Sequence, residues 1–231
     1  TGVQTCAFRS RIGAVVLVHN VTELRRRDRA LVSKDVTIRE IHHRVKNNLQ
    51  AVSALLRLQS RRMDDDVARA AIEEAIRRIA SIAHVHETLS TSAQDSVQFD
   101  EVVLKLLQSA LELSPRPSEI EINKRGDFGS IPSLIATPLA LILTELIQNS
   151  LEHGLNVTGS KLEVSVSRRD SKFKVSVSDD GSGLKSGFDP IKSPSLGLEI
   201  VRTLTANELS GELRFERLAQ GTKAEIEFNL N

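Results

Sequence analysis

The sequence predicts a long helical hairpin followed by an α+β two-layer sandwich. Two segments without glycine or proline, residues 22–62 and 67–89, predict the helices of the hairpin. After residue 97, helix-like and strand-like patterns alternate along the chain, which indicates a mixed sandwich. Hydrophobic residues make up 40% of the 231 residues, enough to fill a core.

Composition excludes several classes of protein. The 31 basic and 30 acidic residues give a net charge of +1, whereas a dedicated nucleic-acid binder usually carries a basic excess. Trp and Tyr are absent, so platforms that stack on bases are not expected. The single cysteine, Cys6, excludes a disulfide framework and a cysteine zinc site, and it fits a reducing compartment. No membrane segment or signal peptide is recognisable, and because residue 1 is Thr we expect a fragment.

The pattern divides the chain into three parts. Residues 12–18 are apolar and β-branched, so we expect residues 1–21 to end an upstream domain that this chain does not include. Residues 22–96 form the predicted hairpin, in which Thr22 is a candidate N-cap and residues 64–66 form the turn. Residues 97–231 form the predicted sandwich.

The hairpin carries apolar side chains on one face of each predicted helix. On a helical wheel centred on Val45, the apolar residues within about 40° are Ile38, Ile41, Leu49, Val52 and Leu56. The corresponding set in the second helix is Ala71, Ala75, Ile79, Ile82, Val85 and Leu89. Two helices cannot bury such a face alone, so the hairpin must dimerise into a four-helix bundle or fold back on the rest of the chain.

The sandwich is predicted element by element. Helices are expected at residues 100–113, at 137–153 with Thr137 as N-cap and Pro138 at the first helical position, and at 195–208. Strands are expected at residues 119–123, 161–167, 172–178, 211–216 and 222–229, with a glycine-rich loop at 179–194.

The segment EIHHRVKNNLQ contains the first candidate for chemistry. On the wheel, His42 lies about 60° from the apolar face, whereas His43 lies about 160° from it. The polar side chains of Glu40 and Asn47 share the face of His43. An exposed imidazole that is partly neutral can act as a nucleophile, although it can equally be an ordinary surface residue. Adjacent residues do not share a helical face, so a metal site made by both histidines is disfavoured.

Two further groups of residues suggest a nucleotide site. Glu145, Asn149 and His153 recur every four residues, and carboxylate and amide oxygens are ligands that suit Mg²⁺. Asp179 ends a predicted strand and is followed by glycines, so its carboxylate could accept a hydrogen bond from an adenine amino group. An amphipathic helix and a simple turn remain the alternatives.

The start of the helix after the glycine-rich loop is a candidate phosphate site. Ser195 is placed to cap this helix, and Gly197 lies in its first turn, where free amides and the helix dipole favour anions. Thr222, at the start of the last strand, could add a hydroxyl group. Each of these features is also compatible with an ordinary cap or turn.

In their order and spacing, the segments EIHHRVKNNLQ, ALILTELIQNSLEHG, VSDDGSGL, SLGLEIV and GTKAEIEF resemble the sensor histidine kinases of the HisKA-2 type. The resemblance covers about residues 22–231. It implies a dimerisation and phosphotransfer (DHp) hairpin followed by an ATPase domain of the Bergerat (GHKL) fold. The strand at 12–18 with Asn20, Val21 and Thr22 resembles the end of a PAS sensor domain. The pattern is most similar to soluble actinobacterial kinases that signal to ANTAR-type, RNA-binding response regulators.

The resemblance implies roles for individual residues. His43 matches the phosphoaccepting histidine, Glu40 is a candidate acceptor of its proton, and Asn47 matches a position that can orient water for phosphatase activity. The residues that match the nucleotide site are Glu145, Asn149, His153, Asp179, Gly181, Gly183, Ser195, Gly197, Leu198 and Thr222. Among them Asn149 matches the Mg²⁺ ligand, with Glu145 as its supporting carboxylate.

The sequence departs from the family pattern in four ways. Asp180 stands where an Asn is common, and Arg44 follows the histidine where the commoner kinase class has an acid. The G2 box, residues 195–197, is shortened and lacks an upstream glycine, and no F box is recognisable. The resemblance implies a cytoplasmic bacterial kinase that uses ATP and Mg²⁺ and forms a homodimer through residues 22–90. Its partner would be a response regulator, without direct binding to nucleic acid. The alternatives are a degenerate kinase that acts as a scaffold and a GHKL ATPase of the Ser-kinase or chaperone type.

Overall fold

A computed structural model gives the fold of the chain in two compact units, residues 1–44 and 45–231, which are described separately. The structure describes residues 3–10, 13–20, 44–45, 47–63, 65–90, 96–112, 114–156, 158–169, 171–184, 187–193 and 195–230.

The first unit contains an antiparallel pair of strands, β1 (Val3–Ser10) and β2 (Gly13–Asn20). The strand expected at residues 12–18 is therefore present as β2. Its partner β1 was not predicted, because residues 1–10 show no clear alternation. The predicted helix over residues 22–43 lies outside the described residues.

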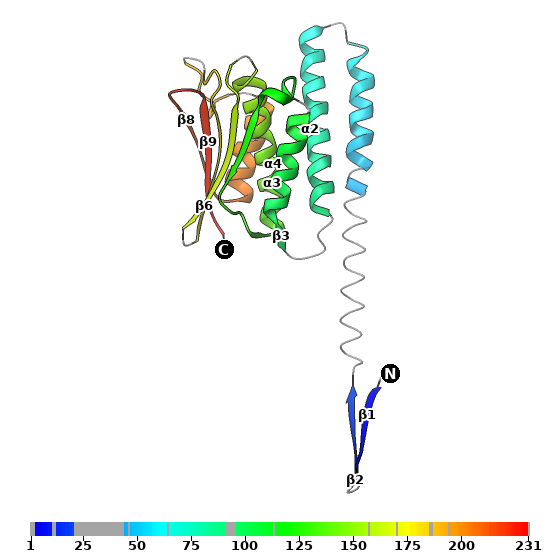
Figure 1. Ribbon diagram of the computed structural model, residues 1–231. Coiled ribbons are helices and arrows are strands. Elements are labelled where there is room, and N and C mark those ends of the chain that lie inside the picture. The colour runs from blue at the N-terminus through cyan, green and yellow to red at the C-terminus, as the bar shows by residue number, and fades with distance from the viewer. Residues whose placement is uncertain are drawn as a thin grey trace. The chain divides into compact units, whose positions relative to one another are not determined.

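The described part of the hairpin includes a helical segment, residues 47–60, a turn at residues 61–63, and α2 (Asp66–Ser90) (Figure 1). Asp66 lies in the first turn of α2, where a negative charge stabilises the helix dipole. The side chain of Asp65 accepts a hydrogen bond from the Ala68 N–H at 3.4 Å. A break between two helices is confirmed, but the described turn residues lie earlier than the predicted 64–66, because Asp66 already belongs to α2.

The sandwich has a five-stranded sheet in the order β4-β6-β7-β9-β8. The β4–β6 pair is parallel and the other pairs are antiparallel. The strands are β4 (Glu121–Arg125), β6 (Lys161–Arg169), β7 (Lys172–Asp179), β8 (Glu212–Arg217) and β9 (Thr222–Asn229). A separate pair, β3 (Ser96–Gln98) and β5 (Ser130–Pro132), was not predicted.

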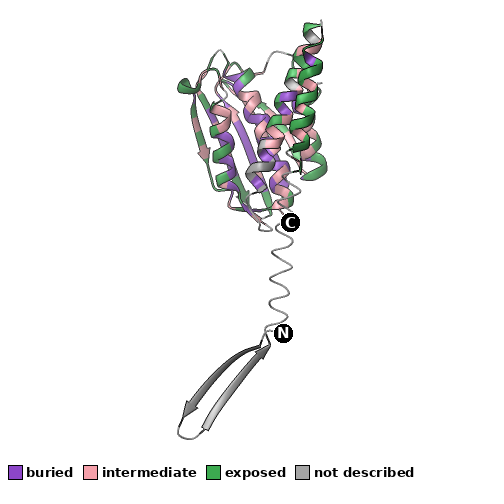
Figure 2. Cartoon of the chain, turned by 90° about the vertical axis from the view of Figure 1, so that its right-hand side faces the viewer, coloured by how far each residue is buried: buried purple, intermediate pink, exposed green. Residues whose placement is uncertain are grey.

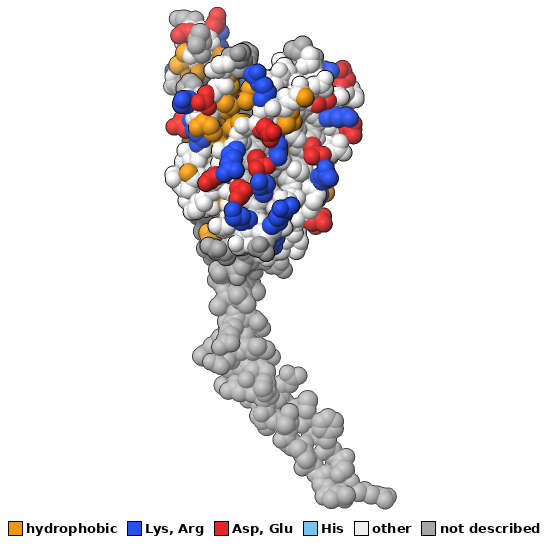
Figure 3. All heavy atoms as spheres, turned by 90° about the vertical axis from the view of Figure 1, so that its left-hand side faces the viewer, with side chains coloured by type: hydrophobic (Ala, Val, Ile, Leu, Met, Phe, Trp, Pro, Cys, Tyr) orange, Lys and Arg blue, Asp and Glu red, His pale blue; other side chains and the backbone are white. Residues whose placement is uncertain are grey.

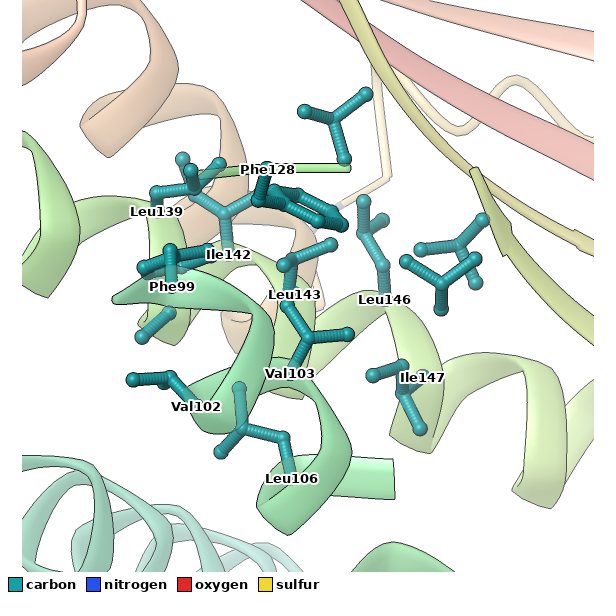
Figure 4. Packing of buried hydrophobic residues seen from close by; sticks show 14 of the residues in the cluster. Phe99, Val102, Val103, Leu106, Phe128, Leu139, Ile142, Leu143, Leu146 and Ile147 are labelled. Carbon is teal, nitrogen blue, oxygen red and sulfur yellow. The ribbon is translucent and has the colours of Figure 1, made fainter. Parts of the chain in front are cut away.

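Helices cover one face of this sheet (Figure 1). They are α3 (Phe99–Glu112), the short η1 (Pro117–Glu119), α4 (Ser133–Asn149) with its π-helical extension η2 (Ser150–Gly154), and α5 (Leu196–Thr203) with the π-helical η3 (Leu204–Glu208). Figure 4 shows side chains of α3 and α4 packed around the ring of Phe128. Ring centroids lie 6.1 Å apart between Phe128 and Phe173 and 5.3 Å apart between Phe173 and Phe228, so an aromatic chain links the helices to the strands.

The start of α4 differs from the prediction. The helix begins at Ser133, so Pro138 lies inside it and Thr137 is not the N-cap. A proline lacks the N–H that bonds to the carbonyl four residues earlier, but near the N-terminus this removes a single helical hydrogen bond. Leu139, Ile142 and Leu143 are fully buried, and their packing outweighs that loss.

The hairpin folds back on the sandwich through α2. Val85 and Leu89 of α2 belong to the same hydrophobic core as α3 and α4. In the other helical segment, by contrast, Val52, Leu55 and Leu58 are 45–62% exposed, and Figure 2 shows little buried surface in the hairpin. The sequence left two alternatives for the hairpin, dimerisation and folding back on the rest of the chain. Folding back buries one face of α2 but leaves Val52, Leu55 and Leu58 exposed.

The outer face of the sheet is charged. Figure 3 shows basic and acidic side chains interspersed on this side of the molecule. Lys172 pairs with Glu227 and Lys174 pairs with Glu225, both at 2.9 Å. Exposed pairs of this kind add little stability, but they keep the second face of the sheet in water, as is usual for an antiparallel sheet with one buried face.

Among the described residues, one helix is long and apolar enough to cross a membrane, Ser133–Gly154. It consists of α4 and η2, and 56% of its apolar window is buried inside the domain. Its hydropathy therefore reflects its central place in the sandwich.

Candidate functional site

A buried carboxylate marks one end of the candidate site. Asp179 is the last residue of β7 and is 5% exposed. Burial raises the pKa of Asp179 above its ordinary value, although the Gly181 N–H, the Ser150 hydroxyl and the Thr222 N–H favour the ionised form. The Gly181 N–H donates to Oδ1 at 3.0 Å. Such a carboxylate can accept a further hydrogen bond from a ligand, as the sequence predicted for Asp179.

Three glycines allow the chain to pack closely around Asp179. A Cβ added at Gly154 would lie 2.6 Å from Oδ1 of Asp179, and one at Gly181 would lie 2.0 Å from the Gly154 carbonyl oxygen. At Gly221, where φ is +83°, a Cβ would lie 1.8 Å from the Asp179 carbonyl oxygen. From the sequence, Gly181 was assigned to the turn, whereas Gly154 and Gly221 were given no role of their own. Gly154 follows His153, and Gly221 precedes Thr222.

Asp180, one of the departures from the family pattern, has a structural role. Its Oδ1 accepts the N–H groups of Ser160 and Lys161, each at 2.7 Å. These bonds hold the loop before β6 against the end of β7. Ser182 adds a second tie, because its N–H donates to the Gly154 carbonyl at 3.0 Å. The turn that follows Asp179 is thereby fixed to η2.

Helix α4 carries the predicted Glu145, Asn149 and His153 along one side, but its last turn is wider than expected. Glu145 is buried at 5% exposure, and Asn149 is half-buried one turn later. The Nδ2 atom of Asn149 is buried and has no hydrogen-bond partner among the described residues. The π-helical turn η2 then breaks the four-residue spacing, and His153 is exposed.

The N-terminus of α5 faces α4. Gly197 and Leu198 are buried in the first turn, and a Cβ at Gly197 would lie 2.5 Å from Oε2 of Glu145. Ser195 occupies the N-cap position, as predicted, but its side chain makes no capping hydrogen bond. Its carbonyl accepts the Glu199 N–H at 3.0 Å. No hydrogen bond from its side chain therefore closes off the first amides of α5.

The loop between Gly183 and Ser195 is tied down at two points that the sequence did not reveal. Arg202 of α5 donates to the carbonyl oxygens of Pro190 at 3.2 Å and Ser193 at 3.1 Å. Arg217 at the end of β8 donates to the Leu184 carbonyl. These arginines hold the ends of a loop whose described part leaves Phe188 and Ile191 exposed.

The residues present fit a nucleotide with a hydrated divalent cation. Within the described ranges, no group of three His, Cys, Asp or Glu residues could hold a metal ion by itself. A cation bound at Asn149 would thus need ligands from the nucleotide, as is usual for Mg²⁺. Asn149 ends α4, and Asp179 of β7 lies against Gly154 at the end of η2, so the two side chains can serve the two ends of such a ligand.

Protein family profiles match both the hairpin region and the sandwich. The profile of the HisKA_2 histidine kinases matches residues 40–114. The profile of the histidine kinase-, DNA gyrase B- and HSP90-like ATPases matches residues 135–231. The chain belongs to the histidine kinases. The predicted family and fold class are thereby confirmed, including the ATPase domain.

Histidine kinases of mycobacteria are among its relatives. The sensor histidine kinase PdtaS of Mycobacterium tuberculosis is 48% identical over 204 residues, which cover 87% of this chain and 41% of that protein. PdtaS of Mycolicibacterium smegmatis is 46% identical over 212 residues, or 91% of this chain and 42% of that protein. The chain therefore spans about two fifths of the length of these relatives.

Solved kinase structures share the fold. The blue-light-activated histidine kinase of Erythrobacter litoralis matches with a TM-score of 0.63 at 24% identity, over 94% of this chain and 64% of that chain. Its isolated histidine kinase domain gives 0.59 at 22% identity, over 87% and 94% of the two chains. A complex of the kinase ThkA with the response regulator TrrA gives 0.52 at 20% identity, over 99% and 75%.

The hairpin residues of this kinase are only partly described. Asn47 is exposed at the start of the helical segment. Glu40 and His43 lie outside the described residues, so the structure gives no distance between the predicted phosphoacceptor and the nucleotide site.

Proposed function

We propose that this chain is the catalytic core of a sensor histidine kinase, in which ATP phosphorylates His43. The observation that carries the proposal is the buried Asp179 in its glycine cradle, connected through η2 and α4 to Asn149 and Glu145. Both lie on a chain that also contains the HisKA_2 hairpin. A scaffold without nucleotide would not need a buried carboxylate held by close glycine contacts at the end of a strand.

Asp179 would recognise the adenine ring. Its carboxylate already accepts backbone N–H groups, and it retains capacity to accept the exocyclic amino group of adenine. Gly181 and Gly183 allow the backbone to approach the base, and Gly183 has a φ of +69° that favours glycine. Thr222 pairs with Asp179 across β7 and β9 and would contribute its hydroxyl group.

The phosphates would lie between α4 and α5. Asn149 would hold Mg²⁺ through its side-chain oxygen, with Glu145 as the supporting carboxylate, and the bound ion would neutralise phosphate charge. The first amides of α5, from Ser195 to Leu198, would bind phosphate oxygens. The exposed His153 would lie on the phosphate side.

In the proposed reaction, a neutral imidazole nitrogen of His43 attacks the γ-phosphorus of ATP in line. The bond from this phosphorus to the bridging oxygen breaks, and ADP leaves with that electron pair. Glu40 is the candidate acceptor of the imidazole proton. The phosphoryl group then passes from His43 to an aspartate of a response regulator. Asn47, four residues after His43, would orient the water that hydrolyses the phosphoaspartate of the regulator and releases inorganic phosphate in a separate phosphatase reaction.

The exposed hairpin face would bind partners. Leu49, Ala54 and Leu58 line a groove of about 630 Å³ together with Ile79 and Ala83 of α2. A second copy of the chain would cover this face and form a homodimer through residues 22–90. Residues 22–96 carry 14 basic and 11 acidic residues, which suits an acidic face of a response regulator, here proposed to be of the ANTAR type. The kinase would act in the cytoplasm as a phosphoprotein.

The direct test is to incubate the chain with Mg²⁺ and ATP labelled at the γ-phosphate. We expect the wild type and His42→Gln, the matched control, to be labelled, and His43→Gln to lose the label. Asn149→Ala should also lose it. The label should be lost in acid and retained in alkali, because phosphohistidine is acid-labile.

Other outcomes would contradict the proposal. Labelling of His43→Gln at the wild-type level would refute the phosphoacceptor, and a label stable to acid would favour a Ser-kinase type of reaction. If calorimetry detects no binding of ATP or ADP to the wild type, the scaffold alternative holds.

A further inference from the structure

The hairpin contributes a charged residue to the nucleotide-binding half of the molecule. Arg78 of α2 is 7% exposed, although it is an arginine on a largely exposed hairpin. Its Nε lies 3.7 Å from Oε2 of Glu145 in α4. The neighbouring Arg77 is of the same type but is exposed. Arg78 is therefore distinguished by its position and not by its chemistry.

Helix α5 also lies close to Arg78 and Glu145. A Cβ at Gly197, in the first turn of α5, would lie 2.7 Å from a terminal guanidinium nitrogen of Arg78 and 2.5 Å from Oε2 of Glu145. Only a residue without a side chain allows α5 to approach so closely. The same α2 helix is held in place by Val85 and Leu89, which are buried in the core of the sandwich.

The charges of this cluster bear on phosphate binding. Glu145 precedes Asn149 by one helical turn and faces the N-terminus of α5, where the proposed function places the phosphates. A buried carboxylate without a neutralising partner would repel an anionic ligand there, since charge interactions are strong where water is excluded. A guanidinium group beside the carboxylate removes this repulsion.

We propose that Arg78 is a positioning residue of the nucleotide site, supplied by the phosphotransfer hairpin. It neutralises Glu145 and holds that side chain against Gly197, so that the phosphate end of the site has its full charge balance only while α2 is docked. The inference rests on the proposed function for the location of the phosphates. It makes nucleotide affinity a property of the hairpin and the ATPase domain together.

The test is calorimetric titration of the 231-residue chain with ADP in EDTA, which removes the divalent cation and leaves the charges of the protein. Arg78→Gln removes the guanidinium charge beside Glu145, and we expect the affinity for ADP to fall about tenfold. Glu145→Gln removes the carboxylate charge beside Arg78 and should raise the affinity about tenfold by the same reasoning. The double variant has a neutral pair and should bind within about twofold of wild type.

Two controls separate charge from folding. Arg77→Gln removes the same charge from the exposed neighbour and should leave the affinity unchanged, whereas Arg78→Lys keeps the charge and should retain most of it. If Arg78→Gln does not fold, the ADP affinities of the other variants test the inference. Glu145→Gln should then bind ADP more tightly than the double variant, and the double variant should bind it about as tightly as wild type.

Equal affinities of Arg78→Gln and Arg77→Gln would overturn the inference, as would a double variant that binds no better than Arg78→Gln. Failure of the wild type to bind ADP in Mg²⁺ would instead refute the proposed function, so the two failures are distinguishable.

Discussion

The sandwich and the hairpin use the same apolar residue types in opposite ways. The core of the sandwich encloses the rings of Phe99, Phe128 and Phe173, which are at most 2% exposed. The helical segment 47–60 leaves Leu55 62% exposed and Leu58 54% exposed. Between them, α2 buries one face in the core and lines the hairpin groove with another. The difference shows that the sandwich buries its apolar core within this chain, whereas the described part of the hairpin leaves large apolar side chains exposed.

The largest expected effect tests this contrast directly. Phe173→Ala removes a fully buried ring that contacts the rings of Phe128 and Phe228, and it should lower the free energy of unfolding by about 4 kcal/mol. Leu55→Ala, the matched change on the hairpin, should lower it by less than about 0.5 kcal/mol in the monomer. Urea denaturation of both variants at low protein concentration measures the difference. Similar losses would contradict the contrast.

A substitution on the face of α2 that packs against the sandwich should lower the free energy of unfolding by an amount between these two. Leu89→Ala removes side-chain packing where α2 enters the sandwich core, and we expect a loss of about 2–3 kcal/mol. Ile79→Ala, on the groove side of the same helix, should cost less. Denaturation followed by circular dichroism measures both losses. An equal loss at the two positions would show that α2 is not held mainly by the sandwich.

Asp100 provides a third test, through pH. Partial burial raises the pKa of Asp100, but hydrogen bonds from Lys124 and from the N–H groups of Gly129 and Phe128 outweigh it, so the pKa lies below its ordinary value. The lowered pKa stabilises the fold above the unfolded-state pKa, and this contribution is lost as pH falls through the folded-state pKa. At pH 7, Asp100→Asn should cost about 2 kcal/mol, and the difference from wild type should shrink in acid. Thermal unfolding from pH 7 to pH 3 measures it.

The contribution of Asp179 to stability should depend on pH in the opposite direction to that of Asp100. Burial raises its pKa, so its contribution to stability is present below the unfolded-state pKa and is lost as pH rises through the folded-state pKa. Relative to wild type, Asp179→Asn should therefore gain stability between acid and neutral pH. ADP should raise the melting temperature of the wild type and not of the variant. A variant that binds ADP normally would refute the adenine-binding role.

The smallest effect on monomer stability is expected on the exposed hairpin face. Val52, Leu55 and Leu58 replaced together by Ser should change the stability of the monomer by about 0.5 kcal/mol at most. The same substitutions should abolish self-association in sedimentation velocity, because they remove the apolar surface proposed for the dimer. Leu134→Ser, at the 88% exposed start of α4, is the matched control and should leave association unchanged.

Much of the fold could be predicted because, along the sandwich, the spacing of apolar residues and the positions of turn residues indicate the same elements. Strands β6, β7 and β9 alternate strictly and lie within two residues of their expected bounds. The start of α4 was missed because Pro138 suggests a first helical position, while core packing extends the helix past it. The pair β3 and β5 was missed because each strand has three residues, too few to show a period.

The site could be predicted where a motif is local and not where tertiary contact decides. Asp179, Asn149 and Gly197 stand out by their neighbours in sequence. Arg78 does not, because nothing in its surroundings separates it from Arg77 until α2 meets α4 and α5. The π-helical turn of η2 also lacks a sequence signal, and it alone moves His153 out of the expected line.

The position of β9 has a consequence for synthesis on the ribosome. This strand pairs with β7 on one side and β8 on the other, yet it is the last of the five to be made. The five-stranded sheet cannot be completed until residues 222–229 have left the exit tunnel. Until then, the apolar faces of α3 and α4 are not fully covered by the sheet. Nascent chains stalled before residue 222 should therefore engage chaperones and resist folding, whereas the hairpin, whose contacts are local, can form helices much earlier.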